Sequence, residues 1–274
     1  MTGGRDRSAG ARWFLGAPPA GPRTQLICLP HGGGAASNYR SWLSALAADV
    51  DVRPVQLPGR ENRRNEPFMV DMDRLVSELA DAVVAADVDD VALFGHSMGA
   101  TIATRLCVAL EERGRAVRGL FVSGHGGPGL LTKASDTELA HRMSALAVET
   151  DEGLWDIMNE LGSLPDTVQQ DKQLFEIFVP ILRADYRLAE GEILGAERVR
   201  APITVLSGAD DPLLDGVDLD RWTTMTGADC ELFRFPGGHF YLIEQRAAVA
   251  GVIRRRLAER AGAEVADAGN GSRS

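Results

Sequence analysis

The segment Val91-Ala92-Leu93-Phe94-Gly95-His96-Ser97-Met98-Gly99 is the most informative part of this 274-residue chain. Its first four residues are apolar and predict a buried strand, and the residues from Ala100 to about Arg113 predict a helix. Between them, two glycines stand two residues on either side of Ser97. A strand that passes into a helix through Gly-x-Ser-x-Gly makes a sharp turn, the nucleophile elbow, which exposes the serine Oγ at the end of a sheet. The segment therefore predicts a nucleophilic serine.

The two glycines of this turn have a steric purpose. A side chain at Gly95 or Gly99 would crowd the strained backbone around Ser97. The helix that follows would point its N-terminal amides at the site, where negative charge develops during acyl transfer. A five-residue pattern alone does not establish an enzyme, so the rest of the chain must supply a base, an acid and an oxyanion hole.

Length and composition fit a single globular α/β domain without a membrane segment. The chain is 45% hydrophobic and 25% charged, and its net charge of −10 argues against nucleic acid and anionic membrane surfaces as partners. No apolar run approaches the roughly 18 residues of a transmembrane helix, and the first residues lack the apolar core of a signal peptide. Its three cysteines, Cys28, Cys107 and Cys230, lie in apolar segments and predict buried, reduced thiols. We therefore expect a cytoplasmic protein.

Strand-like and helix-like segments alternate along most of the chain. The apolar patterns predict strands at 25–29, 52–57, 91–94, 117–123, 202–206 and 231–235, and helices at 37–48, 71–86, 100–113 and about 241–260. This alternation favours the α/β class, with a mostly parallel twisted sheet flanked by helices. We place one domain at 23–262. Residues 1–22 are predicted to be mostly disordered, with a possible edge strand at Trp13-Phe14-Leu15, and 263–274 to form a disordered tail.

The alternation stops between about 130 and 195, where helices are predicted instead. Ser135-Asp136-Thr137-Glu138 is a capping box that would open one helix. Further helices are predicted around 154–161 and 168–188, and Pro180 is expected to kink the last of them. A helical insertion between the strands of such a sheet usually shapes the substrate site, so we expect a lid here.

A glycine-rich loop follows the strand predicted at 25–29. In His31-Gly32-Gly33-Gly34, the glycines let the backbone approach a ligand closely. In hydrolases with a nucleophile elbow, such a loop donates one amide to the oxyanion hole, and the residue after the nucleophile donates the other. The donors here would be Gly32 or Gly33, together with Met98. The alternative is a simple loop that turns into the next helix.

Two later loops supply candidates for the acid and the base. Asp210 and Asp211 follow the strand at 202–206, and either carboxylate could orient a catalytic histidine. His239 follows the strand at 231–235. His125 also follows a strand, but in α/β-hydrolases the base comes after the acid in the chain, which favours His239. We therefore expect a triad of Ser97, an aspartate and His239. No spacing of His, Cys and carboxylate residues suggests a metal site.

Several longer motifs accompany these residues. Four lie in the predicted sheet and its loops, namely Cys28-Leu29-Pro30-His31-Gly32-Gly33, Gln56-Leu57-Pro58-Gly59-Arg60, Gly95-His96-Ser97-Met98-Gly99-Ala100 and Phe235-Pro236-Gly237-Gly238-His239-Phe240. Two more lie in the predicted lid, namely Leu161-Gly162-Ser163-Leu164-Pro165 and Leu182-Arg183-Ala184-Asp185-Tyr186-Arg187. Together they make the chain, from roughly Leu26 to Leu242, resemble the type II (editing) thioesterases of polyketide synthase and nonribosomal peptide synthetase systems. That family belongs to the α/β-hydrolase superfamily.

The resemblance also bears on single residues. It implies that the acid is Asp211, which directly precedes a proline, and not Asp210. The chain departs from the family at Gly32, where alanine is more frequent, but a backbone amide donates from either residue. The segment 213–217 also follows the family pattern more loosely, which predicts a less rigid acid loop.

The resemblance implies a function. It is the hydrolysis of acyl groups from the phosphopantetheine arm of acyl or peptidyl carrier proteins, which edits stalled or aberrant units in polyketide or nonribosomal peptide antibiotic biosynthesis. No cofactor is implied beyond the phosphopantetheine that the partner carries, and we expect a monomer. Arg60, Arg63 and Arg64 form a basic cluster on an acidic chain and, with His31, are candidate contacts for the carrier or its phosphate. The alternative for the arginines is a solvated loop.

Two other functions stay open from the sequence. A general carboxylesterase or lipase would use the same triad on small soluble esters, and would cleave them much faster than carrier-bound thioesters. A non-catalytic interaction protein on a hydrolase scaffold is the third possibility, and it would be favoured if Ser97 failed to react with a fluorophosphonate.

Overall fold

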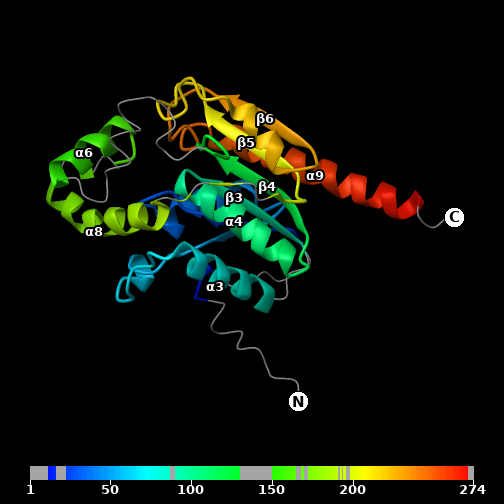
Figure 1. The fold of residues 1–274 in the computed structure, drawn as a ribbon, viewed down its shortest axis with the longest axis horizontal. Coiled ribbons are helices and arrows are strands. Elements are labelled where there is room, and N and C mark those ends of the chain that lie inside the picture. The colour runs from blue at the N-terminus through cyan, green and yellow to red at the C-terminus, as the bar shows by residue number, and fades with distance from the viewer. Residues whose placement is uncertain are drawn as a thin grey trace, which may run out of the picture.

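A parallel sheet forms the centre of the molecule (Figure 1). The structure is a computed structural model that describes residues 12–16, 23–86, 90–129, 150–164, 168–169, 172–190, 192, 194–195 and 198–270. The sheet has six strands in the order β2-β1-β3-β4-β5-β6, and every neighbouring pair is parallel. The strands are β1 (Gln25–Leu29), β2 (Asp51–Pro54), β3 (Val91–His96), β4 (Val117–Ser123), β5 (Ile203–Gly208) and β6 (Cys230–Phe235). The α/β class predicted from the alternation is confirmed.

Helices cover both faces of this sheet. The α-helices are α2 (Arg40–Ala45), α3 (Met72–Ala85), α4 (Met98–Glu112), α6 (Asp151–Glu160), α8 (Lys172–Ala189) and α9 (Arg246–Asn270), and the short 3₁₀ helices are η1 (Ala36–Tyr39), η2 (Glu61–Arg63) and η4 (Leu219–Met225). One hydrophobic core joins α3 and α4 to the sheet, and a second core joins α2 and α9 to it. Strands β1, β3 and β5 are buried along their whole length. Coverage on both faces explains why these strands are mostly apolar and do not alternate between apolar and polar residues.

The helical insertion, which we define as α6 and α8, lies between β4 and β5 in the chain. The two helices lie together at one side of the molecule, away from the projecting end of α9 (Figure 1). They share a third hydrophobic core, to which Leu154, Ile157, Phe175 and Leu182 belong. Pro180 lies inside α8, and the kink expected there stays a prediction. None of the described helices is long and apolar enough to cross a bilayer.

Most predicted elements are present, with shifted ends. Strands β1 and β4 have the predicted bounds, and α3 buries the predicted stripe of Leu75, Leu79 and Val83. The helix expected at 37–48 is instead the pair η1 and α2, which ends at Ala45. The possible edge strand near Trp13 is a single antiparallel bridge between Phe14 and Val55.

The C-terminal prediction needs a correction. Helix α9 begins at Arg246, and it continues to Asn270, so the disordered tail predicted from residue 263 is wrong for 263–270. The physical reason is helix propensity: 261–268 is polar but contains alanine at four of its eight positions, and alanine is the strongest helix former. Polarity alone therefore misjudged this segment.

Some predictions fall outside the described residues. They concern the disorder of 1–11 and 17–22, the capping box at 135–138, Pro165 and the end of the tail at 271–274. All three cysteines are free, as predicted. Cys28 and Cys107 are buried, as expected, whereas Cys230 on the edge strand β6 is only partly buried.

Candidate active site

Ser97 occupies the turn between β3 and α4. Its backbone has φ of 54° and ψ of −121°. A positive φ is costly for a residue with a side chain, and strain of this kind gathers at functional sites. The Ser97 amide donates to the carbonyl oxygen of Ser123 at 2.8 Å, and the Ser97 carbonyl accepts from the amide of Ala100 at 2.8 Å. These two hydrogen bonds hold the turn in its strained form.

The glycines of the elbow are sterically required, as predicted. A Cβ on Gly95 would overlap the carbonyl oxygen of Gly99, and a Cβ on Gly99 would overlap the carbonyl oxygen of Leu29. Both obstacles are backbone atoms of the central strands and the elbow, which do not move aside without disturbing the sheet. The serine is therefore presented by a turn that admits only glycine at these two positions.

Asp211 and His239 form a buried pair. Nδ1 of His239 lies 2.8 Å from Oδ2 of Asp211, and the two residues are 2% and 3% exposed, respectively. The other oxygen, Oδ1 of Asp211, accepts a hydrogen bond from the amide of Leu213 at 3.0 Å. Asp210, in contrast, is exposed. Of the two carboxylates that chemistry alone left open, the structure brings Asp211 to the histidine.

Backbone contacts align the two loops that carry this pair. The amide of Ala209 donates to the carbonyl oxygen of Phe235 at 2.8 Å, and that of Asp210 donates to the carbonyl oxygen of Gly237 at 3.0 Å. A Cβ on Gly208, the last residue of β5, would overlap the carbonyl oxygens of this neighbouring loop. The loops after β5 and β6 therefore lie in contact, which fixes the acid against the base.

One cavity joins the serine to this pair. Ser97, His239, Gly32 and Met98 all line it. Its apolar wall includes Met158 of α6, Leu161 directly after α6 and Tyr186 of α8. The loop after β5 adds Leu213, Leu214 and Val217. The helical insertion therefore forms part of the wall of the cavity onto which the serine opens.

The structure separates the two candidate donors of the glycine-rich loop. The amide of Gly33 donates to Oδ2 of Asp185 in α8 at 2.7 Å, so the alternative that Gly33 serves the oxyanion hole is wrong. Gly32 lines the cavity, and among the described residues no acceptor takes its amide. Met98 is the first residue of α4, where backbone amides point outward from the helix end. The remaining donor pair is Gly32 and Met98.

Two further histidines, His96 and His31, lie near His239. The ring of His96 lies 4.8 Å from that of His239, and its Nδ1 is 2.9 Å from Oγ of Ser123, which is 2.7 Å from the hydroxyl of Tyr241. Burial lowers the pKa of His96 well below its usual value, and the nearby His239 and His31 lower it further. Burial also lowers the pKa of His31 to about 3. Both side chains are therefore neutral at pH 7.

His125, the competing base, is engaged elsewhere. Its Nε2 lies 3.1 Å from Oγ1 of Thr101, and its Nδ1 accepts a hydrogen bond from the amide of Gly127 at 3.0 Å. Burial, and then the charge of His239, lower the pKa of His125 to about 4. Because both ring nitrogens already have partners, His125 lines the cavity but offers no free nitrogen to act as the base.

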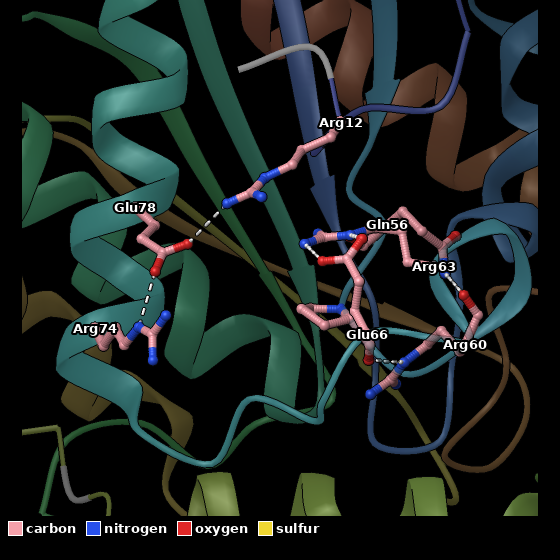
Figure 2. A network of polar contacts seen from close by, with 8 residues as sticks. Arg12, Gln56, Arg60, Arg63, Glu66, Arg74 and Glu78 are labelled. Carbon is pink, nitrogen blue, oxygen red and sulfur yellow. Dashed lines mark hydrogen bonds and ion pairs between the residues drawn. The ribbon is translucent and has the colours of Figure 1, made fainter. Parts of the chain in front are cut away.

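The basic cluster needs a correction. Arg60 and Arg63 are each 4% exposed, so the prediction that they contact a carrier is wrong for both. Arg63 donates to the carbonyl oxygen of Gln56 at 2.7 Å and to both carboxylate oxygens of Glu66 at 2.8 and 2.6 Å (Figure 2). Its guanidinium also lies 4.3 Å from the centre of the Trp13 ring. Only Arg64 is exposed, and for that residue the contact stays a prediction.

Sequence reasoning missed Asp185. The motif that contains it was recognised, but its role as the partner of Arg60 and of the glycine-rich loop was not. A signal was present, because an arginine after one strand and an aspartate in the insertion both belong to the family-like motifs. Among the described residues, no three His, Cys, Asp or Glu side chains are arranged to hold a metal ion.

The placement of serine, acid and base defines the class of protein. Ser97 follows β3, Asp211 follows β5 and His239 follows β6, so all three stand at the carboxyl edge of one parallel sheet and in this order along the chain. That order and that edge are those of the α/β-hydrolases. The chain has the α/β-hydrolase fold.

A narrower assignment follows from comparison with known proteins. Residues 24–257 match the family model described as "Thioesterase domain". The chain belongs to this thioesterase family, whose members are serine hydrolases that act on thioesters, and the resemblance inferred from the motifs is confirmed.

Individual relatives agree with this family. The probable cadicidin biosynthesis thioesterase of Streptomyces griseus is 33% identical over 90% of this chain and 66% of its own length. The thioesterase PikA5 of Streptomyces venezuelae is 34% identical over 85% of this chain and 80% of its own length. The solved structure of BorB, the type II thioesterase of the borrelidin cluster, is 37% identical, with a TM-score of 0.76 over 90% of this chain and 98% of BorB.

The relatives differ in length. The chain spans 66% of the cadicidin thioesterase and only 11% of the AMB antimetabolite synthetase AmbE of Pseudomonas aeruginosa, which is 34% identical to it over 91% of this chain. The same domain therefore occurs as part of a much larger synthetase and as a chain close to this one in length.

Proposed function

We propose that this protein is a type II thioesterase that releases acyl groups from the phosphopantetheine arm of carrier proteins in polyketide or nonribosomal peptide biosynthesis. The observation that carries the proposal is the single cavity onto which Ser97 and His239 open beneath the helical insertion. The thioesterase match over residues 24–257 supports the chemistry. Relatives named for cadicidin, borrelidin and yersiniabactin biosynthesis support the setting.

The first half of the reaction acylates the serine. Nε2 of His239 removes the proton from Ser97 as Oγ attacks the thioester carbonyl carbon. The tetrahedral oxyanion accepts hydrogen bonds from the amides of Gly32 and Met98, each of which contributes about 10²–10³ in kcat. The carbon–sulfur bond then breaks as the imidazolium of His239 gives its proton to the sulfur, so the pantetheine leaves as a thiol and His239 is neutral again. Asp211 keeps the proton of His239 on Nδ1, so Nε2 is free to act as the base, and stabilises the imidazolium that forms.

The second half releases the acid. His239 removes a proton from a water molecule, the hydroxide attacks the acyl-Ser97 ester, and the same two amides hold the second oxyanion. The proton returns to Oγ of Ser97 as the ester bond breaks. The products are a carboxylic acid and the free serine, so no cofactor beyond the partner's phosphopantetheine takes part.

The insertion gives the acyl group its surroundings. Met158 of α6, Leu161 directly after α6 and Tyr186 of α8 line the cavity together with Leu213 and Leu214. An acyl chain held between them would leave water, which stabilises its binding by roughly 25 cal/mol per Å² of apolar surface buried. We propose that α6 and α8 act as the lid of the site, that the protein works as a cytoplasmic monomer, and that Arg64 contacts the acidic carrier.

The test uses acyl-loaded carrier protein and follows the loss of the acyl mass. We expect the wild-type protein to release the acid and Ser97→Ala to be inactive. Release that survives in Ser97→Ala contradicts the proposed nucleophile. Much faster cleavage of small soluble esters than of the acyl carrier would instead favour a general esterase with the same triad.

A further inference from the structure

Helix α8 packs on the glycine-rich loop through one face. Leu182, Asp185 and Tyr186 are three and four residues apart, so they share a side of the helix. Cδ2 of Leu182 lies 2.6 Å from the place that a Cβ on Gly33 would occupy, and Cζ of Tyr186 lies 4.0 Å from the corresponding place on Gly32. The insertion therefore touches the loop that donates to the oxyanion.

Asp185 binds both this loop and Arg60. Its Oδ2 accepts from the amide of Gly33 at 2.7 Å and from Nη1 of Arg60 at 2.7 Å, and its Oδ1 accepts from Nη2 of Arg60 at 2.6 Å. Asp185 is 1% exposed and Arg60 is 4% exposed. Two parallel charge-assisted hydrogen bonds fix the geometry of the pair as well as its charge.

Arg60 holds the next residue of the same loop. Its Nη1 donates to the carbonyl oxygen of Gly34 at 2.9 Å. Arg60 is itself fixed, because its carbonyl oxygen accepts from the side-chain amide of Gln56 at 3.4 Å, and Oε1 of Gln56 accepts from the amide of Ala36 at 3.1 Å. The amide of Gly33 and the carbonyl of Gly34 are therefore held by the two members of one buried ion pair.

A purely structural purpose explains this pair poorly. Two buried charges must be removed from water, and well-packed apolar side chains of similar volume often stabilise a fold as well or better. The charges do have a use at this place, since they fix two backbone groups directly after Gly32. Glycine has the greatest backbone freedom of all residues, so the direction of the Gly32 amide depends on such external contacts.

We propose that Arg60 and Asp185 are positioning residues that orient the oxyanion loop, so that the amide of Gly32 points at the reacting carbonyl only while α8 lies on the loop. The inference deepens the proposed function and rests on Gly32 being an oxyanion donor. Seating of the helical insertion and assembly of the oxyanion hole are then one event. Loss of the pair weakens binding of the tetrahedral oxyanion and leaves binding of the ground-state substrate unchanged.

The experiment replaces the pair by apolar residues of similar volume, Arg60→Met with Asp185→Leu, which removes both charges together. Three quantities are measured: kcat and KM on a soluble acyl-N-acetylcysteamine thioester, affinity for an alkyl trifluoromethyl ketone, and affinity for an acyl-pantetheine analogue with an amide in place of the thioester. The ketone forms a tetrahedral oxyanion on Ser97, whereas the amide analogue remains planar.

We expect kcat and the affinity for the ketone to fall together by at least about tenfold, with KM and the affinity for the amide analogue within about twofold of wild type. The control is Asp151→Asn, which removes the ion pair between α6 and Arg183 of α8 at 2.8 Å without touching the loop. It should leave the affinity for the ketone unchanged.

The proposal is overturned if the double variant unfolds cooperatively and binds the ketone as tightly as wild type. Should that variant not fold, Arg60→Lys decides by the same measurement, because lysine keeps the charge and lacks the two-pronged donor. The outcome is separable from that of the proposed function. A wild-type protein that cleaves the soluble thioester and ignores the acyl carrier contradicts the function alone, and an unchanged affinity for the ketone contradicts only the positioning role.

Discussion

Asp211 binds His239 with one carboxylate oxygen and the amide of Leu213 with the other, so its side chain has little freedom to turn away from the histidine. In Asp211→Asn, the amide side chain can present an NH₂ group to Nδ1, which favours the wrong tautomer of the imidazole. We expect kcat to fall by about 10⁴-fold, the loss that this change produces in a serine protease triad. Steady-state hydrolysis of a soluble thioester measures it.

The matched control for this change is the neighbouring carboxylate. Asp210 is exposed, so Asp210→Asn removes the same charge one residue away without touching the histidine. It should keep kcat within about twofold of wild type. Equal losses in the two variants would mean that the acid loop takes another arrangement during turnover.

Alanine should have opposite effects on stability at Gly99 of the elbow and at Gly251 of α9. In Gly99→Ala the new methyl group meets the carbonyl oxygen of Leu29, so we expect a loss of about 3 kcal/mol or more in the free energy of unfolding, as for overpacking at a rigid site. Gly251 lies inside α9 with nothing within 4 Å of the place that a Cβ would occupy, so Gly251→Ala should raise stability by about 0.5–1 kcal/mol. Urea unfolding of both variants measures the difference.

The pKa of His125 predicts how stability depends on pH. Its value of about 4 in the folded protein lies below the value of about 6.5 in the unfolded chain, so the unfolded chain binds the proton first. The stability that the neutral ring provides is present above pH 6.5 and is lost as the pH falls towards 4. In His125→Asn, which keeps an acceptor for Gly127, the slope of unfolding free energy against pH should be smaller between pH 6 and 4.5. The reduction is at most about 1.4 kcal/mol per pH unit. An unchanged slope would contradict a neutral, partly buried His125.

Arg63 and Arg64 should respond differently to alanine. Arg63→Ala removes the donors to Gln56 and Glu66 and the cation over Trp13, so we expect unfolding free energy to fall by about 2–3 kcal/mol. Arg64→Ala should leave the free energy of unfolding within about 0.5 kcal/mol of wild type, as for other exposed substitutions.

If Arg64 contacts the carrier, its loss raises KM for the acyl carrier and leaves KM for a soluble thioester unchanged. An unchanged KM for the carrier rejects that contact.

Local patterns in the sequence were sufficient for the frame of the fold. Runs such as 25–29 and 117–123 gave correct strands because apolar continuity is a local property of buried parallel strands. The order of Ser97, Asp211 and His239 could be predicted for a related reason, since each follows a strand and the carboxyl ends of parallel strands meet at one edge.

What escaped prediction depends on partners that are distant in the chain. The buried position of Arg60 cannot be predicted from its neighbours in the sequence, because its partner Asp185 lies 125 residues later, inside an insertion whose packing no local pattern reports. The glycine-rich loop alone does not distinguish Gly32 from Gly33 as the oxyanion donor, because the acceptor of the Gly33 amide lies 152 residues away. Asp210 and Asp211 have the same chemistry, and only the conformation of their loop decides that the side chain of Asp211, and not that of Asp210, contacts His239.

The contact between Asp185 and the amide of Gly33 has a consequence for protein engineering. One way to change the acyl groups that such a thioesterase accepts would be a chimera in which its helical insertion is exchanged for that of another enzyme. In this chain such a graft would also replace Asp185, which accepts the hydrogen bond from the amide of Gly33, while the glycine-rich loop itself would stay that of the recipient. A donor insertion without a carboxylate at the position of Asp185 would leave Arg60 buried and uncompensated. Compatible donors and recipients should therefore be chosen by this pair before any comparison of their acyl pockets.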